Sequence, residues 1–184
     1  PPLLVSADQR RQAKAINFGI VYGMGAFRLA AELGVSRAEA SSYLERFHAR
    51  YAGVRTFHES CVQAAHSDGY ATTMFGRRRP IPELRASSKR EVAQAERIAI
   101  NTPVQGSAAD ILKLAMVQLD AALTEQFPAS RLLLTVHDEL VLEAPVEEAS
   151  AVATLTKKVM EEATRLRVPL VVDVGTGAHW GEAH

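Results

Sequence analysis

The sequence predicts an α+β fold. Helical patterns dominate the chain up to about residue 126, and strand and helix patterns are mixed after that point. No repeated strand–helix–strand pattern is present, which argues against a parallel sheet. The 184 residues, 47% apolar and 23% charged, match one globular domain or slightly more. The single cysteine excludes an internal disulfide framework, and the length suffices for a core that folds without one.

Each expected element carries a local signal. Ser6 or Asp8 is a suitable N-cap for the first helix, and Ser36 with Glu39 three residues later matches a capping box. Gly34 suits the left-handed conformation that ends many helices. Helices are expected at 8–23, 27–33, 36–47, 54–67, 87–126 (broken or bent near Pro103) and 146–166, and strands at 70–75, 77–82, 132–136, 140–143 and 170–174.

Charge is distributed unevenly, although 21 basic and 21 acidic residues give a formal net charge of zero. Residues 1–119 hold 16 Lys and Arg against 10 Asp and Glu, a net charge of +6, and residues 120–184 carry −6. The two basic clusters are Arg10, Arg11 and Lys14, then Arg77, Arg78, Arg79, Arg85, Lys89 and Arg90. Two clusters in one part of the chain favour phosphate contacts, and a solvated basic face is the alternative.

A first candidate site lies on the first expected helix. Arg10, Lys14, Phe18 and Tyr22 are four residues apart, so they form a slowly turning stripe on one side of a helix. The cations of such a stripe could bind phosphates while the aromatic rings meet a sugar or base. The alternative is an amphipathic helix that buries Phe18 and Tyr22 in a core and leaves the cations in solvent.

A second candidate set, Arg97, Asn101 and Gln105, has the same spacing on a later helix. Amide side chains beside an Arg can hydrogen-bond the acceptors that every base pair presents in the minor groove. Ordinary polar surface is the alternative interpretation.

The third candidate is His137-Asp138-Glu139, between two strands rich in Leu and Val. Adjacent carboxylates at the tip of a hairpin are fixed by the flanking strands, and Mg²⁺ is commonly bound by one or two carboxylates plus substrate phosphates. A solvated turn is the alternative.

Taken together, these segments resemble the family A DNA polymerases. Residues 10–23 (RRQAKAINFGIVYG) are similar to motif B of that family, and residues 136–139 (VHDE) to its motif C. Residues 101–110 (NTPVQGSAAD) and 75–79 (FGRRR) also resemble family segments in the same order. The resemblance covers nearly the whole chain, from about Asp8 to Trp180.

The resemblance implies a role for each candidate residue. Arg10 and Lys14 would hold the triphosphate of the incoming nucleotide and meet the charge that develops on it during transfer. Phe18 would pack against the sugar and base, and Tyr22 would guard the pocket of the template base. Asp138 would be one of two metal-ligating aspartates, with Glu139 in support. The residues expected to contact primer–template DNA near its terminal pair are Arg97, Asn101, Gln105 and His137.

The resemblance also implies an architecture and partners. We expect part of a right-hand polymerase fold without its thumb, with fingers at residues 1–88 and palm at 89–184. The expected cofactor is Mg²⁺ in a two-metal site, and the expected partners are primer–template DNA, dNTPs and the missing N-terminal part of the polymerase. No membrane partner is expected, and the expected location is the cytoplasm.

One element of the family is not found. Its second catalytic aspartate, in motif A, precedes motif B, whereas only nine residues precede Arg10 here. We therefore expect the C-terminal part of a polymerase, which catalyses template-directed addition of dNMP to a primer 3′-hydroxyl only as part of the whole, while the isolated chain is inactive. The alternative is a non-catalytic remnant that still binds primer–template DNA.

Overall fold

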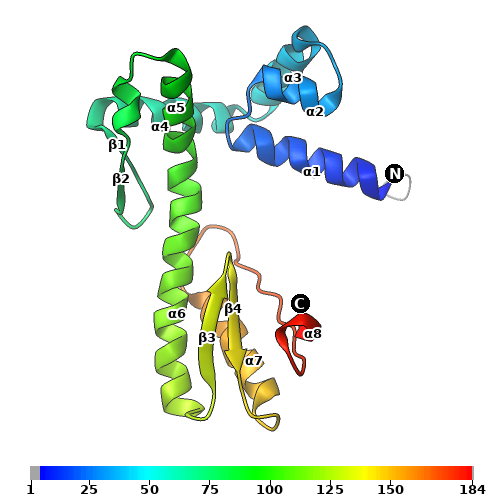
Figure 1. Ribbon diagram of the computed structural model, residues 1–184, viewed down its shortest axis with the longest axis vertical. Coiled ribbons are helices and arrows are strands. Elements are labelled where there is room, and N and C mark those ends of the chain that lie inside the picture. The colour runs from blue at the N-terminus through cyan, green and yellow to red at the C-terminus, as the bar shows by residue number, and fades with distance from the viewer. Residues whose placement is uncertain (1–4, 184) are drawn as a thin grey trace. The chain divides into compact units, whose positions relative to one another are not determined.

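Most of the chain is helical in the computed structural model, which describes residues 5–183 (Figure 1). The chain divides into two compact units between Gly106 and Ser107, and each unit has a core of its own. The expected boundary between fingers and palm after residue 88 is a functional division that these units do not test, so it stays a prediction. Within the described range, no helix is both long and apolar enough to cross a bilayer.

The first unit begins with the four helices expected from the sequence. They are α1 (Ala7–Val21), α2 (Ala26–Leu33), α3 (Arg37–Arg50) and α4 (Ala52–Asp68). Ile16 and Ile20 of α1 form a core with Leu29 of α2 and Ala40 of α3. Figure 1 shows α2 and α3 against each other beside the C-terminal half of α1. This core therefore holds one side of α1 and leaves the opposite side open to solvent.

The helix caps confirm the local signals. Ser6, one of the two expected N-caps, accepts a hydrogen bond from the Gln9 N–H at 3.1 Å, and the Gln9 side chain accepts from the Ser6 N–H at 2.9 Å. Ser36 and Glu39 form the same reciprocal pair at the start of α3. Gly34 ends α2 in the left-handed conformation, with φ of 66°. Capping of this kind stabilises a helix by about 1 kcal/mol.

A hairpin and a second core complete the first unit. Strands β1 (Tyr70–Thr72) and β2 (Arg78–Pro80) pair antiparallel, and the 3₁₀ turn η2 (Pro82–Arg85) leads to α5 (Lys89–Asn101). The buried core residues here are Ala65, Ala71, Ile81, Leu84, Ala95 and Ala99. The expected edge strand is confirmed. Pro80 lies at its end, where the lack of a backbone N–H removes the least hydrogen bonding from the sheet.

The expected break near Pro103 takes the form of a π-helical turn, η3 (Thr102–Gly106). Pro103 has no N–H to donate to the preceding turn, which disfavours regular α-helix at that point. Gly106 lies against buried Thr73, which follows β1: a Cβ on Gly106 would stand 2.7 Å from the Thr73 methyl group. The Thr73 hydroxyl accepts hydrogen bonds from the N–H groups of Phe75 and Arg77, at 3.3 and 3.2 Å. One threonine therefore joins the hairpin turn to η3.

We expect Gly106→Ala to destabilise the first unit by about 1–3 kcal/mol, the usual cost of overpacking. Thr73 cannot yield easily, because moving it breaks the hydrogen bonds that hold the hairpin turn. The matched control is Gly53→Ala in α4, where nothing lies within 4 Å of the added methyl group and Ala is the better helix former. Urea unfolding of both variants measures the difference, and equal stability would contradict the Thr73 contact.

A second expectation concerns pH. Desolvation, and then the charges of His58 and Arg55, lower the pKa of His48 on α3, with Glu59 acting in the opposite direction. The unfolded chain therefore binds a proton near the ordinary histidine value of about 6.5, whereas the folded chain resists it. This contribution to stability is complete above about pH 6.5 and is lost as the pH falls below that value.

The measurement is the urea midpoint at pH 7.5 and at pH 5.5. The decrease in the urea midpoint from pH 7.5 to pH 5.5 should be smaller in His48→Phe than in the wild type. The control is His179→Phe, a substitution at an exposed site. An unchanged pH dependence in His48→Phe would show that His48 does not resist protonation.

The second unit is built on a long helix and a hairpin. Its elements are α6 (Ser107–Gln126), β3 (Arg131–Val136), β4 (Glu139–Glu143), α7 (Ala149–Glu162) and the short α8 (Trp180–Ala183). Leu119 and Leu123 of α6 form a buried core with Val152 of α7, and Leu140 and Leu142 of β4 pack against it. In Figure 1, α6 runs beside β3, and α6 also contacts α7.

The hairpin contains one irregularity. Leu132 pairs with Leu142, and the next pair is Leu134 with Val141, so Leu133 is an extra residue in β3. Leu133 and Leu134 are both about half exposed, at 52% and 45%. This is the arrangement of a β-bulge, which bends a strand and shifts its side-chain alternation.

Two expectations for the end of the chain were wrong. No strand forms at 170–174: the described part of this unit has only the β3–β4 pair to which a strand could be added, and the Val172 N–H donates instead to the Glu161 carboxylate at 3.0 Å. The expected helix 146–166 is shorter, from Ala149 to Glu162. It starts later because a turn follows Pro145, whose carbonyl oxygen accepts from the Glu148 N–H at 2.9 Å.

Candidate functional site

The stripe expected on α1 is continuous: Arg10, Lys14 and Phe18 are exposed, and Tyr22 is half-buried. The Lys14 ammonium group lies 5.9 Å from the centre of the Phe18 ring. The rings of Phe18 and Tyr22 are stacked, with centroids 6.3 Å apart and planes 18° from parallel. Phe18 is 50% exposed, while Ile16 and Ile20 are buried on the other side of the helix. The alternative that placed Phe18 and Tyr22 in a core is therefore wrong for Phe18, whereas Tyr22 is half-buried.

The cationic end of this surface, Arg10 and Lys14, has no carboxylate partner in the part of the chain that the structure describes. Asp8, the acid nearest in sequence, forms an ion pair with Arg11. Among residues 5–183, no carboxylate is paired with the side chain of Arg10 or Lys14, and both side chains are exposed. Two unpaired cations one helical turn apart, next to two stacked rings, suit a ligand that has both phosphate and aromatic parts.

The turn that follows α1 lies next to Arg97 of the second candidate set. Gly23 has φ of 80°, a conformation that favours glycine, and a Cβ there would lie 3.5 Å from Arg97 and from Ile100 of α5. Arg97 is exposed, and Asn101 is half-buried with an Oδ1 atom that accepts no hydrogen bond from any described residue. Gln105 lies exposed in the π-helical turn. The structure thus brings Arg97 next to the end of α1.

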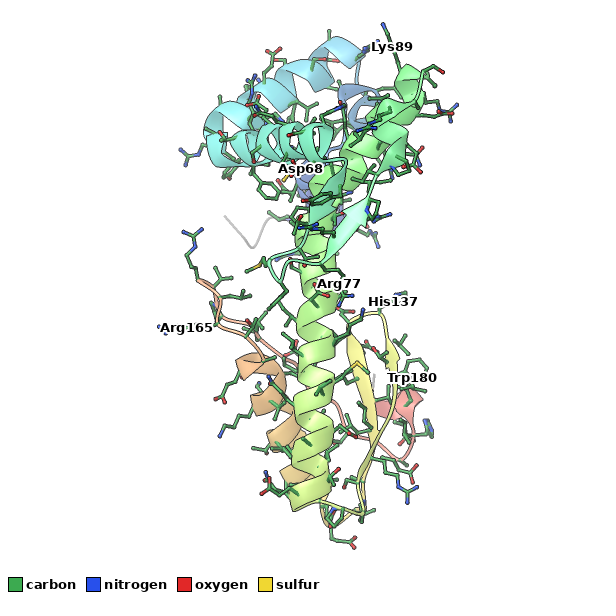
Figure 2. The ribbon with its side chains drawn as sticks, turned by 90° about the vertical axis from the view of Figure 1, so that its left-hand side faces the viewer. Asp68, Arg77, Lys89, His137, Arg165 and Trp180 are labelled. Carbon is green, nitrogen blue, oxygen red and sulfur yellow. The ribbon has the colours of Figure 1, made fainter. Side chains whose placement is uncertain are left out.

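The third candidate lies at the tip of the β3–β4 hairpin, where Figure 2 labels His137. Val136 pairs with Glu139, so His137 and Asp138 form a two-residue turn. His137 has φ of 55°, in the left-handed region that costs a non-glycine residue about 1–3 kcal/mol. Asp138 is exposed and Glu139 is half-buried. Such strained backbone occurs often at functional sites.

The hairpin tip provides ligands of the type that a hard divalent cation requires, but too few of them for a complete metal site. Asp138 and Glu139 are carboxylates, the ligands that Mg²⁺ prefers. Within residues 5–183, no group of three His, Cys, Asp or Glu side chains lies close enough to hold a metal ion. Asp138 and Glu139 therefore fit as a contribution to a metal site that needs further ligands. The tip belongs to the second unit and α1 to the first.

Sequence reasoning missed one contact of α1. His58 of α4 makes a hydrogen bond with the carbonyl oxygen of Val21, at 2.9 Å. The two residues are 37 positions apart, and no spacing pattern connects them.

The sequence of the chain matches the family model for DNA polymerase family A over residues 1–182. The chain belongs to this family. It is 51% identical over 179 residues to a DNA polymerase I of Lactococcus lactis subsp. cremoris, a match that covers 97% of this chain and 20% of the relative. It is 49% identical to a DNA polymerase I of Deinococcus radiodurans, over 96% of this chain and 18% of the relative. The chain thus spans about a fifth of the length of these curated relatives.

A solved structure shares the fold. The POL domain of Pol1 from M. smegmatis, in complex with DNA primer-template and dNTP, superposes with a TM-score of 0.93 at 42% identity. The match covers 100% of this chain and 32% of that chain. The expected α+β polymerase fold is confirmed.

Proposed function

We propose that this chain is the part of a family A DNA polymerase that binds the incoming dNTP and supplies one carboxylate of the catalytic metal site. The observation that carries the proposal is the surface of α1 on which exposed Lys14, exposed Phe18 and half-buried Tyr22 follow one another in contact. The family membership and the fold support it, as does the dNTP in the solved relative.

In this proposal each residue has a physical task. Arg10 and Lys14 bind the triphosphate through charge-assisted hydrogen bonds and oppose the negative charge that grows on it during transfer. Phe18 packs against the sugar and base, and Tyr22 lies at the template-base pocket. Phosphoryl transfer requires mainly positioning and charge stabilisation, which is what these side chains provide.

Asp138 would hold a Mg²⁺ ion, with Glu139 in support. A metal pair bound there would supply Lewis-acid activation of the primer 3′-hydroxyl and charge stabilisation for the leaving pyrophosphate. The residues proposed to contact primer–template DNA are Arg97, Asn101, Gln105 and His137.

The test separates binding from catalysis in the isolated 184-residue chain. We expect it to bind a labelled primer–template duplex with an affinity that falls steeply with salt, and to bind dNTP. We expect no primer extension with Mg²⁺, because Asp138 and Glu139 alone provide too few ligands to hold two metal ions. Template-directed extension by this chain alone would contradict the incomplete metal site, and DNA binding without dNTP binding would favour a non-catalytic DNA-binding remnant.

A further inference from the structure

The last turn of α1 is closed by a side chain from another helix. A helix leaves its last carbonyl groups without partners inside the helix. Three of them are satisfied locally: the oxygens of Phe18, Gly19 and Ile20 accept from the N–H groups of Tyr22, Met24 and Gly23, at 2.9, 2.8 and 2.9 Å. The oxygen of Val21 accepts instead from Nε2 of His58, at 2.9 Å. Because a carbonyl oxygen can only accept a hydrogen bond, the Nε2 atom of His58 must carry the proton in this contact.

Aromatic neighbours hold the His58 ring in place. Its centroid lies 6.2 Å from that of His48 on α3, with the rings nearly perpendicular, and 6.2 Å from that of Phe57. His58 is half-buried, so water competes only in part for the Val21 carbonyl oxygen. The neighbouring charged groups, Arg55 and Glu59, form an ion pair with each other at 2.8 Å.

The hydrogen bond controls the peptide unit that leads into Tyr22. A peptide is planar, so the carbonyl group of Val21 and the N–H of Tyr22 turn together. The N–H is held by Phe18 and the carbonyl oxygen by His58. With both ends fixed, this plane sets the direction in which the Tyr22 side chain leaves the backbone.

We propose that His58 is a positioning residue for the nucleotide-binding surface of α1. It acts through the Val21–Tyr22 peptide and keeps the Tyr22 ring stacked on Phe18. This inference rests on the proposed function, in which those two rings meet the incoming nucleotide. Without the hydrogen bond the peptide can turn, and the rings must be ordered again at each binding event.

The test uses three variants of the isolated chain and a fourth in reserve. His58→Phe keeps an aromatic ring in the packing but removes the donor. His58→Gln offers an amide Nε2–H close to the lost one. The matched control is His66→Leu on the same helix, which removes a histidine whose Nε2 pairs with Glu96 at 3.0 Å. His58→Leu repeats the measurement if the Phe ring prevents folding.

Two quantities are measured: amide hydrogen exchange at Tyr22 and Gly23 by NMR, and the Kd for dGTP by calorimetry. We expect His58→Phe to speed exchange at Tyr22 and to raise the Kd about 3- to 10-fold, the value of one neutral hydrogen bond. His58→Gln should restore both quantities to within about twofold of wild type, as a shared donor predicts. His66→Leu should change neither.

Unchanged exchange and affinity in His58→Phe would overturn the inference, and so would a loss in His58→Gln equal to that in His58→Phe. A wild-type chain that binds no dGTP would contradict the proposed function instead. In that case the exchange measurement alone decides whether His58 holds the Val21–Tyr22 peptide: faster exchange in His58→Phe supports that contact, and unchanged exchange overturns it.

Discussion

Asp138→Asn is expected to lower kcat by about 10³-fold or more in a whole family A polymerase that carries this segment. The substitution keeps the size of the side chain but removes the negative charge that would hold Mg²⁺. Lewis-acid stabilisation of the transferring phosphate contributes several kcal/mol, and each 1.36 kcal/mol corresponds to a tenfold change in rate. Single-turnover incorporation of one nucleotide measures the effect directly.

The control for this experiment is Asp173→Asn, an exposed aspartate in the same unit. It should leave kcat within about twofold, as expected for a surface substitution away from the site. Binding of primer–template DNA without metal should be retained in both variants, because Asp138 donates nothing to DNA phosphates. A fully active Asp138→Asn polymerase would remove the hairpin tip from the proposed metal site.

Lys14→Ala is expected to weaken dNTP binding to the isolated chain by about 10- to 100-fold. A hydrogen bond to a charged group contributes about 1.5–3 kcal/mol, and every 1.4 kcal/mol is a factor of ten in Kd. The helix itself should persist, because Ala is the best helix former and the capping box at Ser6 is untouched. Calorimetric titration with a dNTP measures the Kd of wild type and variant.

The matched control is Lys158→Ala, which removes an exposed lysine from α7 in the other unit. It should leave the Kd unchanged. Duplex binding should fall only slightly in Lys14→Ala, because this lysine is assigned to the nucleotide. An equal loss of affinity for duplex and for dNTP would show that Lys14 belongs to a general phosphate-binding surface.

Local features of the fold could be predicted from the sequence because their causes lie within a few residues. The capping box at Ser36 and the left-handed Gly34 depend on neighbours three or four positions away, and both are confirmed. The strand expected at 170–174 was wrong for the opposite reason. An apolar run becomes a strand only when another strand offers hydrogen bonds, and here the Val172 N–H finds the Glu161 carboxylate instead.

The candidate site likewise contains features that could be predicted from the sequence and features that could not. The order of Lys14, Phe18 and Tyr22 along one side of α1 follows from helical spacing and could be predicted. The packing of Gly23 against Arg97, and the hydrogen bond from His58, join residues distant in sequence, so no pattern in one chain indicates them. The roles of these residues in binding and catalysis remain predictions that the variants above test.

The extra residue Leu133 has a consequence for the carboxylate at the hairpin tip. Side chains alternate strictly along a strand, so one inserted residue exchanges odd and even positions for everything that follows it. The direction in which the Asp138 side chain points at the hairpin tip is therefore set by Leu133 in β3, five residues earlier in the sequence. Deleting Leu133 would remove no residue named in the proposed reaction. It would, however, exchange the two faces of β3 to which the side chains between Leu133 and Asp138 point.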